Sequence, residues 1–190
     1  MTRYQTSKTI NLLLKALTAG GVLSAGLIAP NSAQLLAKIT QPILDRDLDQ
    51  KELQKLLKYM ERTKLVELSV RDNNIHAQLT TKAERRLRDF EIDEIAIDSP
   101  KTWDKKWRIL IYDIPHDKRD SRYYLLEQLH RLGFYKLQDS TWVYPFPCSQ
   151  EILEILERLE IDQYTTFIVG DIETKDDATL IKHFSLFKHV

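Results

Sequence analysis

The sequence predicts an α+β fold in two parts, an N-terminal winged helix-turn-helix and a C-terminal ferredoxin-like (βαββαβ) domain. Three observations lead to this prediction. Residues 1–97 are mostly helical in their apolar spacing, with one pair of short β-like runs. Residues 107–190 alternate β-like runs with helical ones. Between them, residues 98–106 carry charges and a Ser-Pro turn signal, which is typical of a linker.

Composition limits the class of protein. The 190 residues are 43% hydrophobic and 29% charged, as in a folded soluble protein, and they suffice for two small domains. The formal net charge is zero, so binding to nucleic acid requires a local basic patch. The single cysteine, Cys148, excludes an internal disulfide and a cysteine-rich zinc site. It is compatible with a reducing, cytoplasmic location.

An apolar segment near the N-terminus resembles a signal peptide at first sight. It spans residues 10–30 and follows basic residues. Asn11 and Lys15 interrupt it, and a Gly-Gly pair breaks it, whereas a membrane-spanning helix needs about 20 mostly apolar residues. We therefore expect buried helices and no membrane partner. The part from Gly20 to Pro30 has no functional interpretation.

The N-terminal part is expected to contain helices, a hairpin and a further helix. The expected helices lie at 7–19, from Asn31 onward, from Leu48 or Asp49 to Thr63, and from Thr80 or Thr81 through Leu87, with strands at 65–70 and 75–79 around a turn at 72–74. Helices followed by a two-stranded ribbon and another helix are the pattern of a winged helix-turn-helix.

The third expected helix has a basic face and an apolar face. At 100° per residue, one narrow sector holds Lys51, Lys55, Lys58 and Arg62. The opposite sector holds Leu53, Leu56, Leu57 and Met60. A DNA-recognition helix needs such an apolar back and a basic front for phosphates and bases. The predicted DNA-binding residues are these four cations, Gln50 and Gln54 beside them, and Arg71 in the wing. A merely solvated face is the alternative, because Glu52 and Glu61 dilute the positive charge.

The C-terminal part is expected to alternate strand, helix, strand, strand, helix and strand. The expected strands start at Trp107, Phe134, Thr141 and Thr165. The first expected helix starts at Asp117, with Asp120 completing a capping box, and ends at Gly133. The second expected helix is capped by Ser149. This order is the split βαβ, or ferredoxin-like, motif. In the tail, Leu180, Phe184 and Phe187 have helical spacing, for covering the sheet or packing on a second copy.

The residues from Trp107 to Ile172 resemble two known families. A strand ending in Tyr-Asp-Ile, a basic helix, a Leu-Gly-Phe break and a Gln-x-Ser-x-Trp run resemble the small CRISPR-associated nuclease of spacer acquisition, the Cas-two family. The fuller order DIP…R…LGF…LQDSTWVYP resembles the middle domain of PaaX-type transcriptional repressors still more closely. The PaaX-type resemblance implies a repressor that binds double-stranded DNA, forms a homodimer through its C-terminal domain and is not an enzyme. A PaaX-type regulator has a further C-terminal domain, which these 190 residues do not reach.

Asp113 is the residue on which the two resemblances differ. The Cas-two resemblance implies a metal-dependent nuclease or spacer-acquisition component, in which paired Asp113 residues hold Mg²⁺ or Mn²⁺. The structural alternative is an aspartate that accepts turn amides after its strand. We favour that alternative and expect no catalytic residue, no metal and no cofactor. A non-enzymatic scaffold tethered to DNA is a third hypothesis.

Three other residues have structural interpretations. Arg119 and Arg122 open a helix, where cations oppose the helix dipole. A phosphate or a partner carboxylate is an alternative ligand for them, but we favour solvation or an ion pair with Asp120 or Glu127. Cys148 has no base beside it in the sequence, so we expect it to pack rather than to react.

Overall fold

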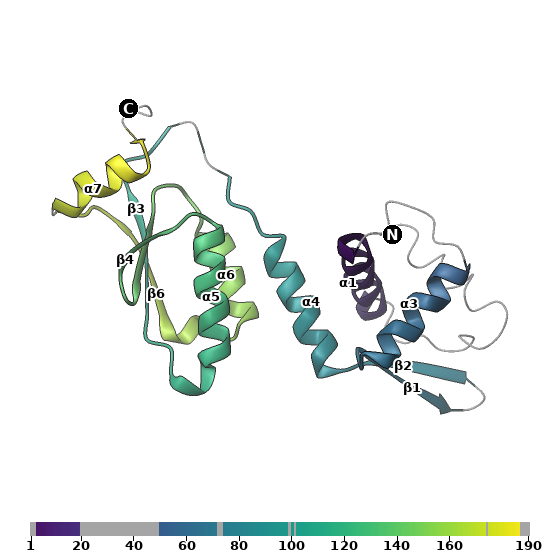
Figure 1. Cartoon of the computed structure of the whole chain (residues 1–190). Helices are drawn as coiled ribbons and strands as arrows, with labels where there is room; N and C mark the ends of the chain where they lie inside the picture. The colour runs from purple at the N-terminus through teal and green to yellow at the C-terminus, as the bar shows by residue number, and fades with distance from the viewer. Residues whose placement is uncertain are drawn as a thin grey trace. The chain divides into compact units, whose positions relative to one another are not determined.

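The computed structural model describes residues 3–19, 50–71, 74–98, 100, 102–173 and 175–186 (Figure 1). Its contacts divide the chain into two compact units, Met1–Glu91 and Ile92–Val190, each of which has its own apolar core. The protein is of the α+β class, with helices and antiparallel strands in both units. In the described part of the chain, no helix is both long and apolar enough to cross a membrane.

The first unit consists of helices and one two-stranded ribbon. In chain order its described elements are α1 (Arg3–Ala19), α3 (Gln50–Arg62), β1 (Val66–Arg71), β2 (Asn74–Leu79) and α4 (Thr81–Asp93). β1 and β2 are antiparallel, paired from Val66 with Leu79 to Arg71 with Asn74. The predicted helix from Asn31 lies outside the described residues, so the winged helix-turn-helix stays a prediction.

A continuous apolar core holds the first unit together. It is formed by buried side chains of α1, α3, β1 and α4 and of the turn before β1: Ile10, Leu13, Leu14, Leu56, Met60, Leu65, Val66, Ala83 and Leu87. α4 begins at a Thr80 cap, whose Oγ1 accepts the Ala83 N–H at 3.3 Å. The expected end of this helix at Leu87 is wrong. The helix continues to Asp93, because Ile92 is fully buried in the core of the second unit.

The second unit is a four-stranded antiparallel sheet with helices. Its elements are β3 (Trp107–Tyr112), the 3-10 turn His116–Lys118, α5 (Arg119–Arg131), β4 (Tyr135–Gln138), β5 (Thr141–Tyr144), α6 (Ser149–Arg158), the 3-10 turn Asp162–Tyr164, β6 (Thr165–Gly170) and α7 (Lys175–His183). The strand order across the sheet is β4-β5-β3-β6, and every neighbouring pair is antiparallel. The predicted βαββαβ order is therefore present.

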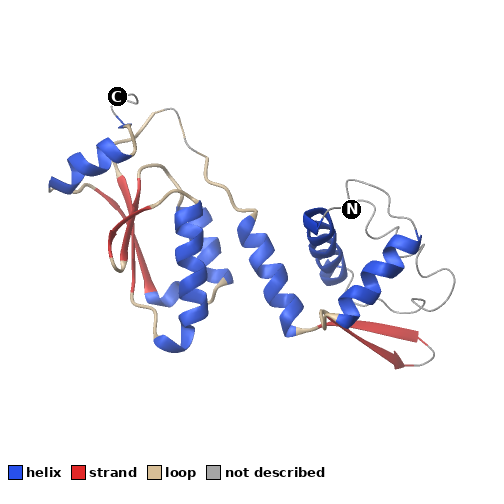
Figure 2. Cartoon of the chain, viewed as in Figure 1, coloured by secondary structure: helices blue, strands red, loops and turns tan. Residues whose placement is uncertain are grey.

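One face of this sheet is covered by α5 and α6 (Figure 2). Strand registers place Leu110, Trp142 and Phe167 side by side on that face, and Trp142 meets the His130 ring of α5 edge-on at 4.6 Å. Ile109 and Ile111 of β3 point to the other face. The two faces of the sheet therefore differ in what covers them.

Both predicted helix caps of this unit are wrong. The segment from Asp117 first forms a 3-10 turn, with the Lys118 N–H donating to Pro115 O at 3.0 Å, and α5 starts only at Arg119. No side-chain cap bond forms there, so the Asp117–Asp120 capping box is absent. Ser149 is the first residue of α6 rather than its cap, and the Cys148 carbonyl accepts the Ile152 N–H at 3.0 Å instead.

The chain ends by packing on its own sheet. Leu180 of α7 is fully buried, and the Phe184 ring lies 6.0 Å from the Trp107 ring. The Trp107 indole N–H donates to the Asp177 carboxylate at 2.8 Å, which fixes α7 at the start of β3. Of the two roles expected for the tail, the structure contains the first, whereas Phe187 lies outside the described residues.

Candidate functional site

The basic face of α3, formed by Lys51, Lys55, Lys58 and Arg62, points into water. All four residues are exposed. Among the described residues, none of the four has an ion pair, so their charges are not neutralised within the described structure. Four free cations along about three turns of helix are suited to an anionic polymer, because each phosphate can meet a separate cation.

A rigid apolar support holds this basic face. On the opposite side of α3, Leu56 is 6% exposed and Met60 is fully buried. Both residues pack in the core formed with α1, β1 and α4. The amphipathic pattern expected from the sequence is therefore present at these two residues, and it fixes which side of α3 is open to a partner.

Tyr59 belongs to the same exposed surface, and the sequence interpretation missed it. The guanidinium carbon of Arg62 lies 5.8 Å from the centre of the Tyr59 ring, a cation–π distance. Tyr59 itself is 36% exposed. Its spacing of three residues from Arg62 was the available signal, since residues so spaced are neighbours on a helix. The contact limits the directions in which Arg62 can point.

Two further cations lie at the C-terminal end of α3. The Lys82 ammonium donates to the Thr63 carbonyl at 2.9 Å, which brings the first turn of α4 to this end. Lys64 is exposed in the turn, with a positive φ of 56°. The sequence interpretation missed both residues, because Lys82 reaches this end of α3 only through the tertiary fold.

The remaining predicted DNA-binding residues are placed by their backbone alone. Gln50 and Gln54 lie in the first turns of α3, and Arg71 is the last residue of β1. Their side chains are outside what the structure describes. Their roles therefore stay predictions.

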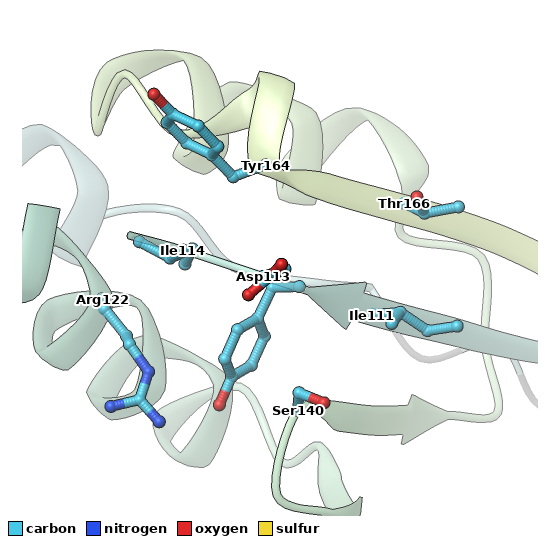
Figure 3. Close-up of a pocket in the computed structure, with 8 residues that line it drawn as sticks. Ile111, Asp113, Ile114, Arg122, Ser140, Tyr164 and Thr166 are labelled. Carbon is cyan, nitrogen blue, oxygen red and sulfur yellow. The ribbon is translucent and has the colours of Figure 1, made fainter. Parts of the chain in front are cut away.

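The second candidate site is a hollow where β3 ends, which we call the strand-end hollow (Figure 3). Its volume is about 520 Å³, and it is lined by Ile111, Tyr112, Asp113, Ile114, Arg122, Ser140, Tyr164 and Thr166. Backbone hydrogen bonds build it: the Tyr112 N–H donates to Ser140 O at 3.1 Å and the Asp113 N–H to Tyr164 O at 2.9 Å. These bonds hold the end of β3 between the starts of β5 and β6.

Two charged side chains in this hollow form no ion pair with another described residue. Asp113 is exposed, and its carboxylate has no hydrogen bond or ion pair within the described structure. The expectation that this carboxylate accepts turn amides is therefore wrong. Of the two expectations for Arg122, the ion pair with Asp120 or Glu127 does not form; its guanidinium carbon lies 5.6 Å from the centre of the Tyr112 ring. The Tyr112 hydroxyl, in turn, donates to Asp139 O at 2.7 Å.

The described residues of one copy do not form a metal centre. No group of three or more His, Cys, Asp or Glu side chains comes close enough together in the described ranges. Asp113 has an arginine rather than a second carboxylate in its hollow. A divalent cation there would need further oxygen ligands from outside this copy.

Cys148 packs in the core, as expected. It is 1% exposed, and burial raises the pKa of its thiol to about 12. Because the thiolate is the nucleophilic form, this cysteine is unreactive near neutral pH.

The second unit belongs to a recognisable class of fold. A βαββαβ chain with its first and third strands central, and both helices on one face, is the ferredoxin-like arrangement. Residues 100–181 match the family model described as the PaaX protein central Cas2-like domain, and this match supports a PaaX-type family for the second unit. No curated protein matches the chain significantly. The resemblance to PaaX-type proteins is thereby confirmed for the second unit.

Proposed function

We propose that the protein is a transcriptional repressor that binds double-stranded DNA as a homodimer in the cytoplasm and is not an enzyme. The match of residues 100–181 to the PaaX central domain supports a regulator of this type. The observation that carries the DNA-binding part is the basic face of α3, with four exposed cations on a buried apolar support.

In this proposal the first unit is a winged helix whose recognition helix is α3. Lys51, Lys55, Lys58 and Arg62 contact phosphates and base edges, and Gln50 and Gln54 pair with bases. Arg71 at the end of β1 reaches a neighbouring phosphate from the wing. The second units pair by two-fold symmetry and set the spacing of two α3 helices on a pseudo-palindromic site. Occupancy of that site represses transcription.

Duplex DNA binding at several salt concentrations tests the proposal. The wild type is compared with a variant in which the four cations of the basic face are replaced by Gln. Since each phosphate contact contributes about 0.9 to the slope of log affinity against log salt, the variant should bind far more weakly and with a much shallower slope. A matched control replaces Lys105, Lys106, Lys136 and Lys182 of the second unit by Gln and should bind like the wild type. Equal binding by the α3 variant and the wild type would refute the role of α3.

The unpartnered Asp113 carboxylate is the observation that favours a second candidate, a metal-dependent nuclease related to CRISPR-associated enzymes. An Asp113→Asn variant distinguishes the two. A repressor keeps its DNA affinity, whereas a nuclease loses cleavage of DNA in Mg²⁺ or Mn²⁺. Cleavage by the wild type that disappears in the variant would replace the proposed function.

A further inference from the structure

The strand-end hollow contains two opposite charges that form no ion pair with the described residues of the same copy. Asp113 follows β3, and Arg122 comes from α5 (Figure 3). Neither side chain forms an ion pair or a side-chain hydrogen bond within the described part of the chain. Arg122 is half-buried against the Tyr112 ring, which holds its guanidinium in place, and the nearby Asp139 carboxylate interacts with it electrostatically without forming an ion pair. A positioned arginine of this kind is suited to a carboxylate.

An exposed apolar patch adjoins the hollow. On the sheet face opposite the α5 and α6 layer, Ile111 of β3 is 37% exposed and Ile168 of β6 is 42% exposed. The register pairs Ile111 with Thr166 and Ile109 with Ile168, so these four side chains form one continuous surface. Ile111 and Thr166 also line the hollow, so the apolar patch and the two charges are continuous.

We propose that this surface binds a second copy of the chain, with Asp113 of each copy paired with Arg122 of the other. A two-fold interface brings residue i of one copy to residue j of the other and also j to i. A surface with one unpaired carboxylate and one unpaired guanidinium therefore supplies both halves of two equivalent ion pairs. The apolar patch forms the centre of the interface, and the ion pairs set its register.

This arrangement gives Asp113 a role that requires no metal. Two Asp113 carboxylates facing each other would repel unless a cation lay between them. When each faces Arg122 of the other copy, the charges are balanced within the protein. The inference rests on the proposed homodimer, because it identifies the residues by which the second units pair.

Charge exchange tests the inference. The full chain is prepared as wild type, as Asp113→Arg and as Arg122→Asp, and dissociation constants are measured by sedimentation equilibrium. Each single variant turns both attractive pairs into repulsive ones. Because a close interfacial charge pair typically couples by tenfold or more, each variant alone should dimerise at least about 100-fold more weakly. An equimolar mixture of the two variants recreates two opposite-charge pairs and should form a heterodimer near the wild-type affinity.

Controls separate this inference from the proposed dimer itself. Glu127→Arg and Arg119→Asp make comparable charge changes at exposed positions of α5 outside the lining of the hollow, and they should dimerise like the wild type. Circular dichroism checks that every variant is folded, and a repeat in EDTA checks that no divalent cation is needed. If the wild type is a dimer and the Asp113 and Arg122 variants dimerise equally well, the proposed ion pairs are wrong, while the homodimer itself stands. The ion pairs are also wrong if mixing the two variants does not restore dimerisation, or if the wild-type dimer is lost in EDTA. A monomeric wild type would overturn the proposed homodimer as well.

Discussion

At the scale of single residues, the cations of α3 differ in what holds them. Lys55 extends from the helix with no described partner, whereas Arg62 is oriented by the Tyr59 ring. A lysine of the first kind acts as a mobile point charge and suits a phosphate. An arginine of the second kind is pre-positioned, as contact with a base edge requires.

Replacing Lys55 with Ala should weaken DNA binding across all sequences alike. A phosphate contact carries no sequence information, so the order of preferred sites should not change, while the salt slope should fall by about 0.9 for each copy of the protein. Fluorescence anisotropy with labelled duplexes at several salt concentrations measures both quantities. Lys182→Ala, which removes an exposed lysine from α7, is the control and should leave the slope unchanged. An unchanged slope for Lys55→Ala would remove Lys55 from the interface.

Cys148 should react with a thiol reagent only after unfolding. Since burial raises its pKa to about 12, its thiolate fraction at pH 8 is about one part in ten thousand, and the surrounding core blocks access. Labelling by Ellman's reagent at pH 8 should be very slow in buffer and complete within minutes in concentrated urea. Rapid labelling of the folded protein would contradict the buried position.

The sequence was informative for residues whose environment depends on local spacing. The exposed cations and the buried Leu56 and Met60 follow from helical periodicity alone. Arg108 shows the opposite case. It is a charged residue 5% exposed near the start of β3, and its partners include the Pro145 carbonyl at 2.9 Å, which only the folded sheet brings near. The same holds for Arg122, whose aromatic partner Tyr112 lies on another element.

At the scale of elements, the end of α5 depends on one backbone conformation. Gly133 has a φ of 84°, and the adjacent Phe134 N–H donates to Leu129 O at 2.9 Å to close the helix. Glycine adopts this conformation without strain, whereas residues with a Cβ do not. The start of β4 is therefore positioned by this turn.

Gly133→Ala should lower the free energy of unfolding by about 1–2 kcal/mol, the cost of a left-handed conformation for alanine. A clash is not the reason, since the nearest atom to an added Cβ is 3.9 Å away. Gly170→Ala is the matched control: an added Cβ there meets no atom within 4 Å, so its effect should stay within about 0.5 kcal/mol. Urea unfolding measures both. Equal effects of the two substitutions would contradict this explanation of the turn.

The segment before β3 is fastened to the sheet by an ion pair that should respond to pH. Arg108 binds Asp104 through two hydrogen bonds of 2.6 and 2.7 Å. Hydrogen bonding to Arg108 is the main reason that the pKa of Asp104 lies below its ordinary value. A carboxyl whose pKa is lowered by folding stabilises the fold when ionised, so this stabilisation is present at neutral pH and is lost as the pH falls below about 4.

Asp104→Asn should therefore lower the free energy of unfolding of the second unit at pH 7 by about 1–2 kcal/mol. This range already allows for the exposure of Asp104 to water, which weakens the ion pair. The difference from the wild type should shrink as the pH falls below about 4. Urea unfolding at a series of pH values measures this, with Asp98→Asn at an exposed position as the control. A difference that stays constant with pH would argue against the ion pair as its source.

Element order was predictable from the sequence, and element ends were less so. The apolar alternation of β3 to β6 and the glycine after α5 sufficed for the βαββαβ order. The starts of α5 and α6 were misassigned, because Asp117 and Ser149 have good capping chemistry that the folded backbone does not use. α4 extends beyond its expected end because Ile92 packs in the core of the second unit, a contact that local patterns do not contain.

At the scale of the whole molecule, the proposal assigns different tasks to the two units. The first presents a basic helix, and the second, whose residues 100–181 match the PaaX central domain, supplies two-fold pairing. With a net charge of zero, the protein as a whole does not attract DNA, so binding depends on where its charges lie. The strand-end hollow could not be predicted from the sequence as a site, because its lining comes from β3, α5, β6 and three connecting segments.

Selection of random duplex DNA by the purified 190-residue chain tests the central claim most directly. The account predicts an inverted repeat whose half-sites are separated by about one helical turn or a multiple of it, because two copies related by a two-fold axis each present one α3. The selected duplex should bind far more tightly than random competitor, and more weakly to the Lys55→Ala variant. Recovery of no common sequence would contradict a sequence-specific repressor, and it would leave a scaffold that binds DNA without sequence preference as the better description.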